Sequence, residues 1–163
     1  MVTKRKVTIA LLELTIVAVI LIYALAPRTL GQATGHVYDR HAVIAVEVEM
    51  TAANAAVEEG AHTLSLTPGT EECDGLLDLL ERRYTPYYLD TNWDESIRSY
   101  AVTITMTTED EACAVSFTEN DPIRITSTKL DRPKTYRIWS GTFQGETLDY
   151  LLKLEDAAGG GAE

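Results

Sequence analysis

The residues best suited to coordinating a metal lie in Asp90-Thr91-Asn92-Trp93-Asp94. Oxygen ligands at alternate positions, in the pattern D-x-[DN]-x-[DN], open the loops that wrap around Ca²⁺. Glu95 replaces the turn glycine of such loops, and Ala101 stands where their bidentate glutamate would be, so the oxygen cage is incomplete. The alternative is a polar loop that holds no metal. The candidate ligands, with Ca²⁺ as the one cofactor considered, are Asp90, Asn92 and Asp94.

Aromatic residues are frequent in the second half of the chain, and Tyr and Trp are favoured at recognition surfaces. Some of them fall on predicted strands and must face inward. Tyr87, Tyr88 and Trp93 surround a predicted loop instead. These three, together with the neighbouring acids, are therefore the candidate binding surface, and the alternative is that they belong to the core.

Two cysteines, Cys73 and Cys113, follow the N-terminal apolar segment. In an oxidising exterior they could form a disulfide, worth roughly 3–4 kcal/mol in the chain-entropy view. Either could equally be a small buried hydrophobic residue. Their separation matches no zinc-ligand spacing, and the histidines are not grouped with them. The disulfide and the two buried thiols both remain open.

Motifs for enzymatic chemistry are missing from the sequence. It contains no G-x-S-x-G, H-E-x-x-H, P-loop or G-x-G-x-x-G pattern. Its adjacent carboxylates, Glu71-Glu72 and Glu109-Asp110-Glu111, fall at a predicted helix start and at a turn, where acids are ordinary. The sequence therefore predicts a protein that binds rather than catalyses.

An apolar run of twenty residues, 7–26, decides the predicted location. A helix of this length crosses the ~30 Å hydrocarbon core of a bilayer. Lys4, Arg5 and Lys6 precede it, and this bias keeps the N-terminus cytoplasmic. We expect a cytoplasmic basic tip (1–6), a transmembrane helix (7–26), a stalk (27–40), an extracytoplasmic domain (41–156) and a flexible tail (157–163).

The same run could instead be a cleaved signal, because Ala24-Leu25-Ala26 resembles a processing site. The run is longer than the apolar region of a signal peptide, and Pro27 after the cut fits an extended substrate cleft poorly. A retained anchor is therefore favoured. The alternative is a secreted enzyme or inhibitor released after Ala26.

Glu13 is an ionisable residue within the predicted span, where a charge costs roughly 2.5–3.5 kcal/mol at the centre and less near an end. Residues 13–20 resemble the opening helix of type IV pilin subunits, which carry a glutamate near the start of an apolar helix. No Gly precedes this helix, although pilin processing requires one. The resemblance implies a structural subunit of a filament or secretion assembly as an alternative function.

Charge disfavours two classes of partner. Four of the 14 cations and one of the 25 acids precede residue 29, so residues 29–163 carry 10 cations and 24 acids, a formal charge of −14. Such a charge repels nucleic acid and anionic lipid headgroups, and it favours cations or basic partners. The length after the anchor suits a single domain with its own core.

The patterning of the remaining chain predicts an α+β domain, an antiparallel β-sheet packed by two helices on one face. Alternating residues predict the strands, and Thr70 is placed to cap the first helix, whose leucine stripe continues to Tyr84 with Arg82 and Arg83 at its C-terminus. The predicted strands are 42–50, 62–67, 100–106, 113–117, 123–126 and 135–139, and the predicted helices are 70–84 and 146–156.

This layout over about residues 60–155 resembles the small membrane-anchored extracytoplasmic domains of Gram-positive bacteria of the Clostridia type. Those families mostly lack an assigned activity, so the resemblance implies a location and a fold. The expectation is a single-pass protein of the cell membrane that contacts the bilayer through residues 7–26. Its external domain would bind an unidentified protein or cell-surface ligand.

Overall fold

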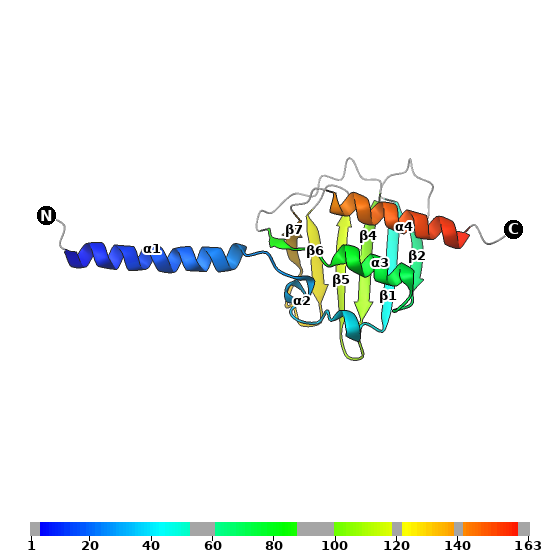
Figure 1. Cartoon of the computed structure of the whole chain (residues 1–163), viewed down its shortest axis with the longest axis horizontal. Coiled ribbons are helices and arrows are strands. Elements are labelled where there is room, and N and C mark those ends of the chain that lie inside the picture. Colours follow the sequence, from blue (N-terminus) through cyan, green and yellow to red (C-terminus); the bar gives the residue numbers. More distant parts are fainter. Residues whose placement is uncertain (1–3, 53–60, 88–99, 119–121, 139–141, 160–163) are drawn as a thin grey trace.

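The computed structural model describes residues 4–52, 61–87, 100–118, 122–138 and 142–159 (Figure 1). Asp90, Asn92, Asp94, Tyr88 and Trp93 lie outside these ranges. The elements, in chain order, are α1 (Lys4–Leu25), α2 (Leu30–Ala33), the 3₁₀ turn η1 (Arg40–Ala42), β1 (Ala45–Ala52), β2 (Ala61–Leu66), α3 (Glu71–Leu80), β3 (Thr85–Pro86), β4 (Tyr100–Thr107), β5 (Ala112–Thr118), β6 (Ile123–Ser127), β7 (Lys134–Arg137) and α4 (Phe143–Gly159).

The strands form one antiparallel sheet with the order β2-β1-β4-β5-β6-β7-β3. The α+β fold with an antiparallel sheet is therefore confirmed. Strand β1 pairs with β2 on one side and with β4 on the other, so the first hairpin and the later meander share a single sheet. The short strand β3, which the sequence pattern does not indicate, adds an edge beside β7.

Alternation along β1 sets which side of the sheet faces the core. Val46, Val48 and Met50 are fully buried, and the intervening glutamates are exposed. The strand begins one residue later than Ile44, which the alternation predicts to point inward, and Ile44 is 57% exposed. Its backbone N–H still donates to the Thr107 carbonyl (2.8 Å), but its side chain lies beyond the buried part of the strand.

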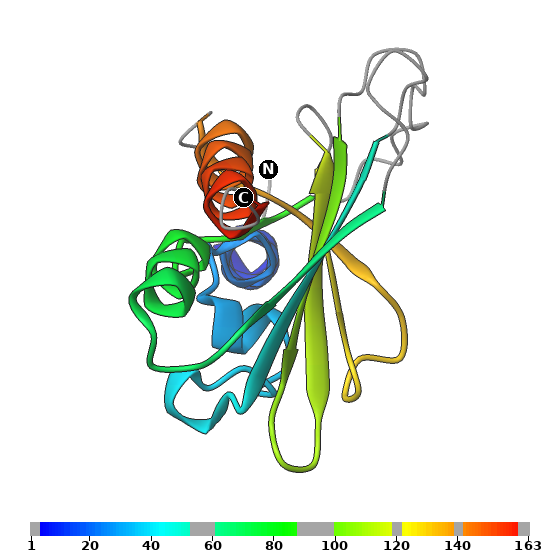
Figure 2. The ribbon, with the colours of Figure 1, turned by 90° about the vertical axis from the view of Figure 1, so that its right-hand side faces the viewer.

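Both longer helices of the domain, α3 and α4, cover the same face of the sheet (Figure 2). Thr70 caps α3 as predicted, because its hydroxyl accepts a hydrogen bond from the Cys73 N–H (3.3 Å). The helix ends at Leu80, earlier than the sequence pattern predicts, so Arg82 lies beyond its last turn. Tyr84 is buried, yet it belongs to the following segment rather than to the helix.

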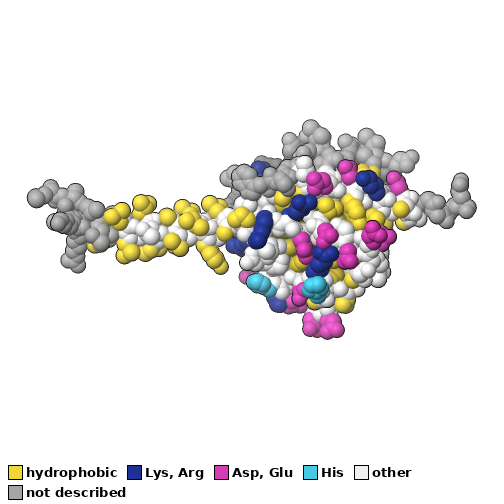
Figure 3. Space-filling model, in the orientation of Figure 1, with side chains coloured by type: hydrophobic (Ala, Val, Ile, Leu, Met, Phe, Trp, Pro, Cys, Tyr) yellow, Lys and Arg dark blue, Asp and Glu magenta, His cyan; other side chains and the backbone are white. Residues whose placement is uncertain are grey.

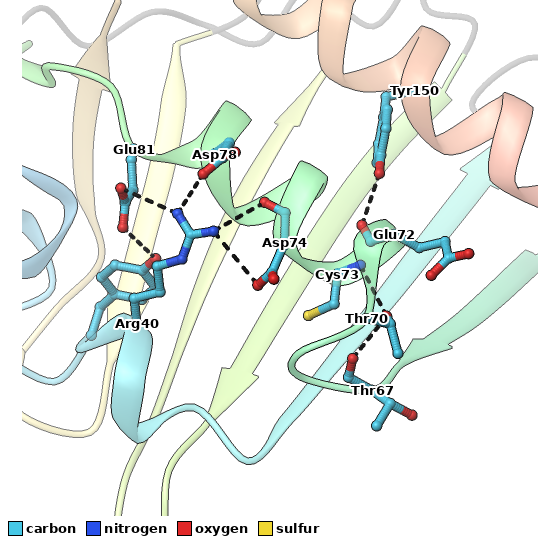
Figure 4. Close-up of polar contacts among 10 residues, drawn as sticks. Arg40, Thr67, Thr70, Glu72, Cys73, Asp74, Asp78, Glu81 and Tyr150 are labelled. Atoms are coloured by element: carbon cyan, nitrogen blue, oxygen red, sulfur yellow. Dashed lines mark hydrogen bonds and ion pairs between the residues drawn. The ribbon is translucent and has the colours of Figure 1, made fainter.

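A glycine brings α3 and α4 together. Tyr150 of α4 donates its hydroxyl hydrogen to the Glu72 carbonyl (2.9 Å), as Figure 4 shows. A Cβ added at Gly75 would lie 2.3 Å from the Tyr150 hydroxyl oxygen, so only glycine permits this approach. The contact sets how closely α3 and α4 approach each other.

The predicted stalk at 27–40 is corrected by the structure, because this segment packs into the domain. Leu30, Ala33 and Val37 are almost fully buried in the core. The Arg28 N–H and C=O bond reciprocally with the Tyr84 C=O and N–H, both at 2.8 Å. The small and polar residues of this segment suggest a linker. Its spaced apolar residues nevertheless bury enough surface to hold the segment against the core.

Helix α1 projects away from the domain along the long axis of the molecule (Figure 1). Its side chains are described at Ile9 and from Leu11 to Leu25. Among the residues whose side chains are described, in α1 and in the other helices, no helical stretch is both long and apolar enough to cross a bilayer.

Candidate functional site

A cleft of about 730 Å³ opens between the loop that follows α2 and the C-terminal end of α3. Its lining joins two segments distant in the sequence. The lining residues are Thr29, Leu30, Gly31, His36, Tyr38, Asp39, Arg40, His41, Glu81, Arg82 and Arg83. The cleft is therefore the best candidate for a ligand site among the described residues.

The short helix α2 shapes one wall of the cleft. The Thr29 hydroxyl accepts from the Gln32 N–H (3.3 Å), and the Gln32 side-chain oxygen accepts from the Thr29 N–H (3.0 Å). At the other end, the His36 N–H donates to the Gly31 carbonyl (2.7 Å) and the Gly35 N–H to the Gln32 carbonyl (3.3 Å). A capping box and a Schellman turn thus fix a single turn of helix at both ends.

His36 has a φ of 65°, a left-handed backbone conformation that residues other than glycine rarely adopt. Gly35 before it has a φ of 72°. Two successive left-handed residues turn the chain sharply, and the imidazole of His36 is exposed at the cleft. Such strain is found preferentially at functional positions.

Arg40 sits at the centre of a cluster of acids from α3 and its C-terminus (Figure 4). Its guanidinium pairs with Asp78, with Asp74 (3.5 Å) and with Glu81 (3.5 Å). The hydrogen bond to Asp78 is the main reason that the pKa of Arg40 is raised further above its already high value. The cluster ties η1 to α3, and its members Arg40 and Glu81 line the cleft.

Tyr38 connects this cluster to the core. Its hydroxyl donates to Oε1 of Glu81 (3.2 Å), and its ring is buried. Burial, followed by the negative charge of Glu81, raises the pKa of Tyr38 well above its ordinary value. Tyr38 therefore acts as a neutral donor throughout the physiological range.

Both cysteines are free and buried beneath this region. The disulfide that the sequence leaves open is not formed in the structure, and the alternative of two buried thiols is the observed state. Burial raises the pKa of Cys113 to about 12, and burial also raises the pKa of Cys73. Neither thiol is ionised near neutrality, so neither supplies a nucleophile.

Tyr87, the one predicted binding residue that the structure describes, lies in a second groove of about 350 Å³. Its ring is half-buried, and the guanidinium carbon of Arg137 lies 4.1 Å from the ring centroid, in a cation–π contact. Its backbone N–H donates to the Thr135 carbonyl (2.9 Å). The described neighbours of Tyr87 are basic, whereas the sequence pointed to acids.

The predicted Ca²⁺ ligands remain a prediction, since they fall outside the described ranges. Among residues that the structure does describe, no group of three His, Cys, Asp or Glu side chains is placed to hold a metal ion. The acids around Arg40 are instead paired with its guanidinium.

Sequence reasoning missed the cleft because it treated residues 27–40 as a stalk. A signal was present in Thr29-x-x-Gln32, the spacing of a capping box, followed by Gly35 at the position that ends a helix. Val37 and Val43 flank the cleft residues with apolar side chains that the structure buries. The pattern is short, since a single turn gives little periodicity to detect.

No protein-family model, curated protein or solved structure matches this chain. Its function is therefore inferred from its own residues and their arrangement.

Proposed function

We propose that this chain is a membrane-anchored extracytoplasmic binding domain, held in the cell membrane by α1 and taking up a polar ligand in the cleft. The observation that carries the proposal is the surface of α1. Among the residues that the structure describes, thirteen large hydrophobic side chains are exposed, and twelve of them lie on α1, with exposed fractions of 49–80%. A helix that is apolar on all sides is stable only when lipid or protein surrounds it.

Polar groups within α1 are compatible with a lipid environment. The Thr15 hydroxyl donates to the Leu11 carbonyl (2.8 Å), so it is satisfied inside the helix. Glu13 belongs to the N-terminal half of the apolar run, where its side chain can reach towards the cytoplasmic headgroups. Lys4, Arg5 and Lys6 favour an N-terminus that stays inside.

The composition of the cleft supports binding. It presents the exposed guanidinium of Arg83 and the exposed imidazole of His41 beside the carboxylates of Asp39 and Glu81. Such a lining suits a polar ligand that carries groups of both signs. The described part of the cleft contains no Ser, Cys or Thr paired with a base, and this favours binding over covalent catalysis.

The anchor is tested by expressing the full chain in a bacterium and measuring the intact mass of the protein in membrane and soluble fractions. We expect an uncleaved chain in the membrane that detergent releases and alkaline carbonate does not. The variant Ile16→Arg/Val19→Arg should shift the chain to the soluble fraction, because each charge costs roughly 2.5–3.5 kcal/mol in the bilayer. The matched control Thr63→Arg/Ser65→Arg changes exposed residues of β2 and should leave the partition unchanged.

Orientation is tested with a membrane-impermeant maleimide on intact cells. Lys153→Cys, exposed on α4, should be labelled, and Thr3→Cys in the basic tip should be labelled only after lysis. The native thiols are buried and should give little background. Labelling at Thr3→Cys in intact cells would contradict the proposed orientation.

The two alternatives correspond to other outcomes of the mass measurement. A chain that starts at Pro27 and is found in the medium would support a released enzyme or inhibitor. Processing just before the apolar helix, with recovery as an oligomer, would support a pilin-like subunit in which copies of α1 cover one another. Either result would overturn the anchored binding domain.

A further inference from the structure

A second groove lies where α1 meets the domain, on the side of β7 and β3. It is lined by Arg28, Pro86, Tyr87, Arg132, Pro133, Lys134, Thr135 and Tyr136. Three of these residues are cations, and the described lining contains no carboxylate. We propose that this groove binds the phosphate of anionic phospholipid headgroups, so that the domain lies against the membrane in which α1 is anchored. The inference rests on the proposed function, because it requires α1 to be in the bilayer.

Position is the first support. Only Ala26 and Pro27 separate the end of α1 from Arg28, so Arg28 lies within about 11 Å of the helix end, even with an extended backbone. The headgroup layer adds roughly 5–8 Å beyond the hydrocarbon core. Arg28 is bonded through its backbone to Tyr84 (2.8 Å, both directions), and α1 contacts β3. With α1 in the bilayer, Arg28 therefore lies in or just beyond the headgroup layer, and the groove that it lines lies at the membrane end of the domain.

Charge pairing is the second support. Arg40 is paired with three acids, Arg82 with Glu146 (3.4 Å) and Lys129 with Glu111 (2.9 Å). In contrast, the side chains of Arg28, Arg132 and Lys134 have no carboxylate partner within the described residues. In a domain with an excess of acids, three unpaired cations that converge on one groove indicate an anion supplied from outside.

The chemistry of the lining is the third support. A guanidinium presents parallel N–H donors that match a phosphate, and an ammonium adds a point charge. Tyr87 places an amphipathic ring beside them, the kind of side chain that is enriched at membrane surfaces. Figure 3 shows that, on this face, basic side chains gather where α1 joins the domain and acidic ones predominate farther away. This asymmetry lets an acidic domain approach an anionic surface by one end.

The test uses the full chain reconstituted in nanodiscs of phosphatidylcholine alone, or of phosphatidylcholine and phosphatidylglycerol in equal parts. A fluorophore is attached at Thr128→Cys, an exposed position four residues before Arg132 in the sequence. Spin-labelled lipid headgroups quench this fluorophore when the domain lies against the membrane, so quenching measures docking. We expect stronger quenching with phosphatidylglycerol, and a loss of this difference at high salt. Arg132→Gln/Lys134→Gln should lower the apparent docking constant about 25-fold, at roughly fivefold per cation.

The matched control is Lys129→Gln/Lys153→Gln, which removes the same charge outside the groove and should alter docking by less than about twofold. Quenching that is indifferent to phosphatidylglycerol, or that falls equally in both double variants, would overturn the headgroup inference while leaving the anchor intact. A chain that does not co-purify with the nanodiscs would overturn the anchor itself, and the docked arrangement with it.

Discussion

Arg40 and Arg132 belong to the same strongly acidic domain, but acidic side chains surround Arg40 and basic ones surround Arg132. Arg40 pairs with carboxylates from α3 and lines the cleft. Arg132 is exposed in a groove whose described lining is basic and carries no acid. A cation whose partners lie within the fold holds elements together, whereas a cation that lacks partners is available to another molecule. The four predictions below test this difference.

The largest expected effect is a loss of stability at alkaline pH, caused by the buried thiol of Cys113. Because Cys113 keeps its proton up to about pH 12 in the folded chain, against an ordinary pKa of 9.0, the unfolded chain ionises first. Stability should be complete below about pH 9 and fall as the pH rises towards 12, by on the order of 4 kcal/mol. Urea unfolding in detergent across this range measures the slope.

Cys113→Ala should reduce that alkaline slope, most clearly between about pH 9 and 10, because the buried Tyr38 also has a raised pKa and contributes only at higher pH. The variant also lowers stability at neutral pH by leaving space in the core. Arg132→Gln, in the groove, should keep the wild-type slope. An equal slope in wild type and in Cys113→Ala would contradict the raised pKa of the buried thiol.

The second prediction compares the two arginines directly. Arg40→Gln should destabilise the domain by about 1–2 kcal/mol, because three partly exposed carboxylates lose their shared counter-ion and repel one another. Arg132→Gln should change stability by less than about 0.5 kcal/mol. Urea midpoints at low and high salt measure both, and a similar loss in both variants would remove the distinction between cleft and groove.

A third, smaller effect separates the two tyrosines. Tyr38→Phe should cost about 0.5–1.5 kcal/mol, since it removes the hydrogen bond to Glu81. Tyr87→Phe should be close to neutral, because the ring under the Arg137 guanidinium is retained. Thermal unfolding of the two single variants is the measurement. A greater loss from Tyr87→Phe than from Tyr38→Phe would indicate that the Tyr87 hydroxyl itself makes a stabilising contact.

The smallest expected change is a gain at His36. Replacing it with Asn, which tolerates a left-handed backbone better, should stabilise the domain by about 0.5 kcal/mol or less. Arg83→Asn, a second exposed cleft residue, serves as the neutral control. Destabilisation by His36→Asn would show that the imidazole makes a stabilising contact in the wall of the cleft.

Much of the fold was predictable, because strands and the capped helix repeat over several residues. The alternation of Val46, Val48 and Met50 and the cap at Thr70 appear in the structure as the sequence indicates. The end of α3 was predicted too late in the chain, because Tyr84 continues the apolar spacing of the helix. In the structure Tyr84 is buried from an extended segment whose backbone pairs with Arg28. Spacing alone does not distinguish a helix from an extended segment that buries the same side chain.

Little of the candidate site was predictable. Tyr87 was identified, but the basic character of its groove comes from Arg132 and Lys134 together with Arg28, which is distant in sequence and meets them only in the fold. The cleft was missed because residues 27–40, which form one of its walls, were predicted to be a stalk. Apart from the capping box at Thr29 in the cleft wall, neither site has a local motif, because each is assembled from side chains of distant segments.

What the sequence by itself determined is what depends on local composition: an apolar N-terminal run, an acidic remainder and an α+β pattern of strands and helices. Hydropathy and periodicity are properties of neighbouring residues, so they can be read along the chain. Only the tertiary structure decided that residues 27–40 belong to the core, that both thiols stay free, and which cations are paired. Burial and charge compensation depend on contacts between residues far apart in sequence, and folding alone brings these together.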